Sequence, residues 1–181
     1  KLSIKMLTQE QQKWLDHLSD TKKIAVVPYN PKTKEVFKII RAELTKILGK
    51  ARISHRGSTA MKISGQGEID LYIPANKKDF DNYVNKLSKY LGEPGSLYEL
   101  ERARFIKYID DIKIEIFVIN KNNSGWKTSV KFERYLKGNP KALSEYEKLK
   151  SKADGQSVRK YYTLKTIFIN KILKLVENGK I

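Results

Sequence analysis

The sequence of 181 residues contains no cysteine and only two histidines, His17 and His55. The absence of cysteine excludes a disulfide framework, a thiolate nucleophile and a cysteine-ligated zinc site, and two imidazoles are too few for a histidine-rich metal centre. No apolar run approaches the roughly 20 residues of a membrane-spanning helix, and no signal-peptide pattern opens the sequence. We therefore expect a cytoplasmic protein without membrane contact. The chain begins at Lys1 rather than at methionine, so one domain of a longer polypeptide is an alternative.

Positive charge is abundant, because 37 Lys and Arg residues against 20 Asp and Glu give a formal net charge of +17. Residues 121–181 hold 15 of these basic residues and five of the acidic ones, so +10 of the charge lies in the last third of the chain. Clustered positive charge favours polyanions such as nucleic acid. The alternative is that the lysines lie on solvated helix faces, so charge alone leaves contact with RNA or DNA open.

Apolar patterning predicts helices and strands in the first two thirds of the chain and helices alone in the last third. The expected helices are a short one capped by Thr8, then 31–48, 77–91 and three pieces between Thr128 and Gly179, the last capped by Ser157. The expected strands are 24–29 (strand-like or extended), 51–55, 68–73, 104–109 and 112–119, the last two joined by a turn at Asp110-Asp111, with a loop over 56–67. This pattern predicts an α+β fold with a mixed sheet of about four or five strands packed with helices. We expect an N-terminal helical extension over 1–23, a core over 24–127, and a helical C-terminal section over 128–181 packed on that core.

Two acids mark one face of the strand expected over 68–73. Glu68 and Asp70 are two residues apart, so they project from the same face with Cα atoms roughly 6.5–7 Å apart, while the apolar residues take the other face. Glu115 lies in the apolar run Ile114-Glu115-Ile116, where a buried, unpaired charge would be costly. A shared Mg²⁺ (or Mn²⁺) would offset that cost, because carboxylate oxygens are the ligands such ions prefer.

Each part of this pattern also has a simpler explanation. An acid–apolar–acid run often marks only the solvated face of a strand, and Gly57-Ser58 by itself is merely a turn. Glu115 by itself is better explained by an ion pair with Arg104, Lys107 or Lys113 across the hairpin. The metal hypothesis requires that Glu115 lie on the same side of the sheet as the other two acids, with no other group between them.

The order of these motifs resembles the DNA polymerase β-type nucleotidyltransferase superfamily: a Gly-Ser turn, about ten residues, an acid–apolar–acid run, and a third acid on a later strand. The run Ser54-His55-Arg56-Gly57-Ser58-Thr59, together with weaker blocks such as 26–31 and 132–136, is similar to the GrpB-like branch of that superfamily over roughly residues 25–173. The chain departs from the branch in the loop 60–67, which is shorter and lacks proline, and at Glu68, where Asp is more usual.

The resemblance implies transfer of a nucleoside monophosphate from a nucleoside triphosphate to an acceptor hydroxyl, with Mg²⁺ or Mn²⁺ as cofactor and RNA such as tRNA as a candidate acceptor. It implies that Glu68, Asp70 and Glu115 are the catalytic and metal-binding residues. The turn Gly57-Ser58-Thr59 would hold the β- and γ-phosphates through its backbone N–H groups and the Ser58 hydroxyl. The alternative is a catalytically silent module of this fold that binds nucleic acid or a protein partner.

Cations should flank the departing pyrophosphate and the acceptor. The candidates at the nucleotide are Arg56 and Lys62, which border the turn, and Arg104 and Arg102. The candidates at the acceptor are Arg134, Lys150 and Lys165, interleaved with Tyr135, Tyr146, Tyr161 and Tyr162. Tyrosines can stack on bases, but helical spacing is more typical of core positions. Each cation proposed at the nucleotide is, by itself, better explained as a solvated surface charge. His55 is better explained as a hydrogen-bonded structural residue than as a catalytic one.

Overall fold

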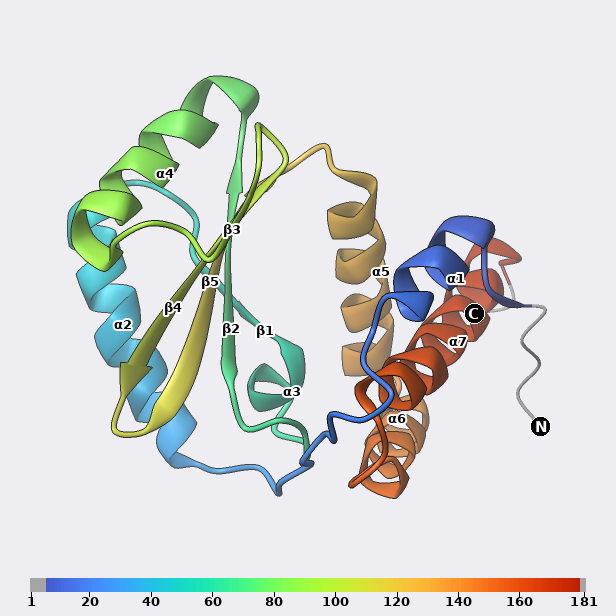
Figure 1. Ribbon diagram of the computed structural model, residues 1–181. Helices are drawn as coiled ribbons and strands as arrows, with labels where there is room; N and C mark the ends of the chain where they lie inside the picture. The colour runs from blue at the N-terminus through green and yellow to red at the C-terminus, as the bar shows by residue number, and fades with distance from the viewer. Residues whose placement is uncertain (1–5, 180–181) are drawn as a thin grey trace. The chain divides into compact units, whose positions relative to one another are not determined.

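The computed structural model describes residues 6–179, which divide between two compact units (Figure 1). One unit comprises residues 29–63 and 67–127, and we call it the sheet unit. The other comprises the described parts of 1–28 and 128–181 together with 64–66, and we call it the helical unit. The described N-terminal residues therefore group with the C-terminal helices.

The sheet unit contains a five-stranded mixed sheet with the strand order β1-β2-β5-β4-β3. The strands are β1 Ser54–Arg56, β2 Ile69–Ala75, β3 Ser96–Tyr98, β4 Arg102–Ile109 and β5 Ile112–Asn120. The central strands β2 and β5 pair in parallel, and all other neighbours pair antiparallel. A mixed sheet of five strands packed with helices confirms the predicted α+β fold.

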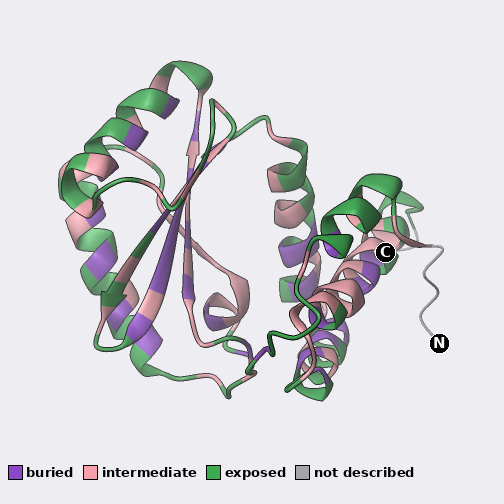
Figure 2. Cartoon of the chain, in the orientation of Figure 1, coloured by how far each residue is buried: buried purple, intermediate pink, exposed green. Residues whose placement is uncertain are grey.

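Helices α2 Lys32–Leu48 and α4 Lys77–Leu91 lie beside the sheet on the side that carries its apolar residues (Figure 1). Their buried positions face a core that includes Ile69, Leu71 and Ile73 of β2 (Figure 2). Burial of each such side chain stabilises the fold by about 1.5–3 kcal/mol. Strict alternation along β2 keeps these residues on the core face and sends Asp70 and the residues in phase with it to the other face.

The predictions for helix α4 and for the turn at Asp110-Asp111 are correct. Helix α4 spans the predicted residues, and Asp110 and Asp111 join β4 to β5 with φ angles of 49° and 62°. Positive φ at both central residues is the signature of a type I′ turn, whose twist matches that of the flanking strands.

Three elements differ from the prediction. Strand β3 follows directly after the predicted turn, at residues for which the sequence predicts no strand. It pairs with β4, and no local sequence pattern indicates that pairing. Residues 57–60 form a helical turn, α3 Gly57–Ala60, inside the predicted loop. The segment 24–29 is not a strand. Its backbone makes one isolated bridge, Val27 with Gly65, and the preceding Lys23 makes another with Ser157.

The helical unit is built from α1 Gln9–Asp16, most of α5 Ser124–Gly138, α6 Pro140–Lys152 and α7 Val158–Glu177. Thr8 and Gln11 form the capping box that the sequence predicts, and the Ser157 hydroxyl accepts a hydrogen bond from the backbone N–H of Lys160 at the start of α7. Helix α5 begins four residues earlier than expected, at Ser124 rather than Thr128.

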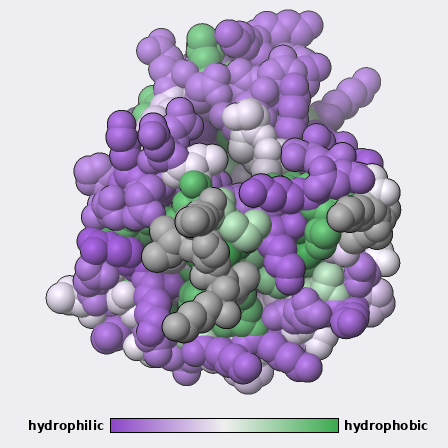
Figure 3. All heavy atoms as spheres, turned by 90° about the vertical axis from the view of Figure 1, so that its right-hand side faces the viewer, coloured by the Kyte–Doolittle hydropathy of each residue, from purple (hydrophilic) through white to green (hydrophobic). Residues whose placement is uncertain are grey.

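Apart from what the grey atoms cover, hydrophilic residues dominate the face of the molecule drawn in Figure 3. Within residues 6–179, no helix combines the length and the apolarity that crossing a bilayer requires.

Candidate active site

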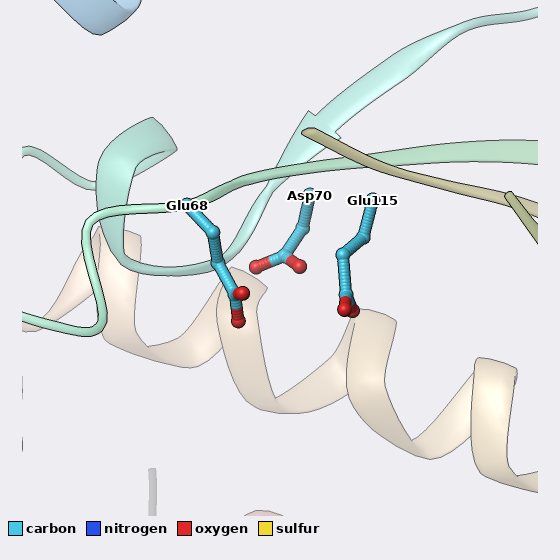
Figure 4. Close-up of side chains that lie close together, drawn as sticks. All are labelled: Glu68, Asp70 and Glu115. Carbon is cyan, nitrogen blue, oxygen red and sulfur yellow. The ribbon is translucent and has the colours of Figure 1, made fainter. Parts of the chain in front are cut away.

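The parallel pairing of β2 with β5 brings the three predicted carboxylates together. Asp70 lies opposite Glu115 in the register, and Glu68 directly precedes β2 on the same face. The three side chains point to the same side of the sheet (Figure 4), and one carboxylate oxygen from each lies within 4.8 Å of the others. Glu115 is 8% exposed, whereas Glu68 and Asp70 are partly exposed. The predicted convergence is confirmed, and three carboxylates at this spacing form a donor set that fits a hard divalent cation.

The side chain of Asp70 packs directly against Gly57. Strand β1 pairs Arg56 with Asp70, so the chain turns into α3 directly beside the Asp70 carboxylate. Gly57 has a φ of +75°, and a Cβ at this position would lie 2.2 Å from Oδ2 of Asp70. Only glycine leaves room for the carboxylate here. The turn therefore sets the position of one carboxylate, a role that the sequence did not indicate.

Thr59 and His55 hold the turn against the neighbouring strands. Thr59 is buried, and its hydroxyl donates to the backbone carbonyl of Glu68 at 3.0 Å and lies 2.9 Å from Nε2 of His55. The Thr59 side chain is therefore structural, and the contact with nucleotide predicted for its backbone in the turn stays a prediction. His55 also stacks on Phe37 at 4.6 Å between ring centroids, which confirms its structural role.

A lysine that the sequence did not single out as a site residue lies between two of the acids. Nζ of Lys113 donates to Oε1 of Glu115 at 2.6 Å and to Oε2 of Glu68 at 3.0 Å. Nη1 of Arg104 lies 3.4 Å from the same Glu115 oxygen. The ion pair given as the simpler explanation of Glu115 is thus present. With Lys113 in this position the requirement that no other group lie between the acids is not met, so a metal site here needs the Lys113 side chain to move away. The sequence could have indicated this contact, because Lys113 is two residues from Glu115 and therefore lies on the same face of β5.

Burial and the contacts with the two acids have opposite effects on the pKa of Lys113. Partial burial by itself would lower the pKa of the ammonium, but the hydrogen bonds to Glu115 and then Glu68 outweigh it and raise the pKa above its ordinary value. Lys113 is therefore charged at neutral pH and serves as an internal cation for the acidic cluster.

Arg56 packs into an aromatic group on the same face of the sheet. Its Cζ atom lies 4.8 Å from the ring centroid of Trp126 and 5.9 Å from that of Tyr72. Tyr72 stacks on Phe117 at 4.7 Å and on Trp126 at 5.3 Å. The strand positions of Tyr72 and Phe117 are two beyond Asp70 and Glu115, so the aromatic group adjoins the acids. Sequence reasoning missed Trp126, because its contact with β2 is purely tertiary.

The remaining predicted cations have diverse surroundings. Lys62 is exposed and has a φ of 56°, and Arg102 lies over the ring of Tyr98 at 5.0 Å. In the helical unit, Arg134 is exposed and Nζ of Lys165 lies 5.4 Å from the Tyr162 ring centroid.

Lys150 corrects one of the acceptor predictions. It is fully buried, and its ammonium donates to the backbone carbonyl of Ser64 within the helical unit. A buried ammonium with this partner is a structural group rather than a contact for an acceptor. Tyr146 and Tyr161 are likewise buried, as the core alternative predicted for them.

Comparisons with known proteins agree with this architecture. The family model described as GrpB protein matches residues 23–175. A UPF0157 protein of Vibrio cholerae is 24% identical over 147 residues, which cover 80% of this chain and 78% of that protein. The crystal structure of the conserved protein GrpB from Enterococcus faecalis matches with a TM-score of 0.62 and 21% identity, covering 82% of this chain and 99% of that chain.

Proposed function

This chain belongs to the GrpB family, and from that membership together with its acidic cluster we propose that it is a Mg²⁺-dependent nucleotidyltransferase. The observation that carries the proposal is the placement of Glu68, Asp70 and Glu115 with oxygens within 4.8 Å of one another beside the Gly57 turn. Their order along the chain matches the nucleotidyltransferase pattern, and their convergence provides the ligand set that such chemistry needs. The reaction would transfer a nucleoside monophosphate from a nucleoside triphosphate to an acceptor hydroxyl, with RNA such as tRNA as the candidate acceptor.

The residues of the sheet unit would share the work as follows. Glu68, Asp70 and Glu115 would hold the metal, and Gly57 would keep the Asp70 carboxylate in place by leaving room for it. Bound Mg²⁺ would offset charge on the phosphates and favour ionisation of the acceptor hydroxyl. The backbone around Gly57 and Ser58 would receive the β- and γ-phosphates.

Cationic side chains would complete the nucleotide site. Arg56 and Arg104 lie on the face that carries the acids, where they would balance the charge of departing pyrophosphate. The aromatic rings of Tyr72 and Trp126 hold the Arg56 guanidinium on that face. Lys62, exposed at the end of the turn, is the further candidate for the γ-phosphate.

The contact between Lys113 and two of the acids favours a second candidate function. An internal ammonium that satisfies Glu68 and Glu115 is what a member of the fold without metal chemistry would need. In that case the chain is a basic module that binds nucleic acid or a protein partner, and the acids have only a structural role.

Binding of nucleotide in the presence of metal separates these two functions. We expect the wild-type protein to bind a fluorescent nucleoside triphosphate in a Mg²⁺-dependent manner, and Asp70→Asn to lose at least about tenfold in affinity, since such ligands act through charge. Asp81→Asn is the matched control, because Asp81 is an exposed acid of α4 outside the cluster. Equal affinity of wild type and Asp70→Asn, with and without Mg²⁺, would exclude the transferase. RNA binding that weakens with salt and ignores Asp70→Asn would then favour the basic module.

Activity has its own assay. Each labelled nucleoside triphosphate is incubated with the protein, Mg²⁺ or Mn²⁺ and total cellular RNA or protein. We expect label to enter one acceptor fraction with wild type and Asp81→Asn but not with Asp70→Asn.

A further inference from the structure

We infer that the ammonium of Lys113 and a divalent cation compete for the same carboxylates, and that a nucleoside triphosphate favours the metal by giving Lys113 another anionic partner. This inference rests on the proposed function and adds a coupling between metal and nucleotide that the acids alone would not have.

The ammonium of Lys113 lies against two of the carboxylates that would bind the metal. Its Nζ atom makes hydrogen bonds of 2.6 Å to Glu115 and 3.0 Å to Glu68, the two acids that flank Asp70. Arg104 reaches Glu115 at the longer distance of 3.4 Å. A divalent ion shared by the three carboxylates would therefore have to displace Lys113 before any other group.

The ammonium of Lys113 can move away from the acids while its backbone stays in β5. Its side chain is 34% exposed, and its four-carbon stem is flexible. Its cross-strand neighbour in the β4–β5 ladder is Tyr108, which is 63% exposed, so the ammonium has solvent close by. Displacement thus needs a change of side-chain rotamer and no rearrangement of the sheet.

A tethered cation differs from a dissolved one in its effective concentration. Lys113 is two residues from Glu115 on the same strand face, which keeps its charge beside the acids whatever the salt composition of the solution. Free metal must compete with this local cation, so the metal affinity of the protein without nucleotide is reduced. A triphosphate beside the cluster supplies new oxygen partners for the ammonium, and coupling of this kind acts equally in both directions.

The test compares Mn²⁺ binding by the full chain and its variants, measured by electron paramagnetic resonance or calorimetry. Lys113→Met keeps the length of the side chain and removes its charge, and we expect it to bind Mn²⁺ about tenfold or more tightly than wild type without nucleotide, because charged hydrogen bonds of this kind carry energies of that order. A non-hydrolysable triphosphate analogue should strengthen Mn²⁺ binding by wild type more than by Lys113→Met.

Two further variants keep the result interpretable. Lys107→Met is the matched control on the neighbouring strand, since within residues 6–179 the charged and hydrogen-bonded partners of Lys107 are Tyr90 and Glu43 rather than the cluster. We expect its Mn²⁺ affinity to equal that of wild type. Lys113→Gln keeps a hydrogen-bond donor without the charge, and it replaces Lys113→Met if that variant does not fold. We also expect Mn²⁺ to raise the melting temperature of the Lys113 variants by more than that of wild type.

The outcomes separate this inference from the proposed function. Mn²⁺ binding that is equal or weaker in both Lys113 variants, while wild type binds, would overturn the competition and leave the transferase proposal standing. Absence of Mn²⁺ binding in wild type and in both variants would overturn the transferase proposal and the competition together. Binding by the Lys113 variants and not by wild type without nucleotide would be the strongest support for the competition.

Discussion

Replacement of Gly57 by alanine tests whether the turn makes room for Asp70. The added Cβ would lie 2.2 Å from Oδ2 of Asp70, whereas ordinary contacts begin near 3.4 Å. The carboxylate would therefore have to retreat by about 1 Å, and sites of this kind tolerate displacements of only about 0.5 Å. The φ of +75° adds a backbone cost of roughly 1–3 kcal/mol for any residue with a Cβ.

Gly92→Ala separates the two effects. Gly92 belongs to the same unit and has a φ of +85°, but a Cβ there meets nothing within 4 Å. We expect each variant to lose roughly 1–3 kcal/mol of stability from the backbone, or about 2–12 °C in melting temperature. Gly57→Ala should lose more than this, and its Mn²⁺ affinity should fall at least about tenfold while that of Gly92→Ala stays unchanged.

Thermal unfolding and Mn²⁺ titration of the two variants decide the matter. A melting temperature of Gly57→Ala within about 2 °C of wild type would show that the backbone and the Asp70 carboxylate adapt without a large cost. Equal Mn²⁺ affinities in wild type, Gly57→Ala and Gly92→Ala would refute the reasoning that this glycine positions a metal ligand.

Three further predictions concern stability, each measured by denaturant unfolding. Lys150→Met should cost about 1–3 kcal/mol, because it removes the buried partner of the Ser64 carbonyl, whereas the exposed Lys152→Met should change stability by no more than about 0.5 kcal/mol; equal values would contradict the structural role of Lys150. Hydrogen bonds from the backbone N–H and hydroxyl of Ser64 lower the pKa of Glu147 from 4.5, against the effect of burial, so the folded state binds that proton more weakly than the unfolded state. The resulting stabilisation should be fully present above about pH 4.5 and disappear as the pH falls through the lower folded-state pKa, so the stability difference between wild type and Glu147→Gln should shrink in acid; a difference independent of pH would count against it. Phe80→Ala, at a position 1% exposed in the core of the sheet unit, should cost about 3–5 kcal/mol, and a loss below about 1 kcal/mol would mean that the core refills the space.

The candidate site could be predicted from the sequence as far as strand geometry determines it. The two-residue spacing of Glu68 and Asp70 puts both on one face whatever the rest of the fold does, and the apolar neighbours of Glu115 select the face of its strand. The same rule places Lys113 beside Glu115, so that contact was within reach of the sequence. The buried state of Lys150 was not, because its partner Ser64 lies 86 residues away.

The sequence by itself determined the properties that depend on neighbours along the chain. These are the capping of α1 by Thr8, the turn at Asp110-Asp111, the extent of α4 and the two faces of β2. Each follows from backbone dihedral angles or from a side-chain period within a few residues, which act in the same way in any fold.

Only the tertiary structure decided which distant groups meet. The pairing of β2 with β5 aligned Asp70 with Glu115, the turn at Gly57 closed on the Asp70 carboxylate, and Trp126 came to lie under Arg56. Such contacts arise from packing of whole elements against a shared core, and their free energy depends on all the residues buried there. For that reason no short stretch of this chain encodes them.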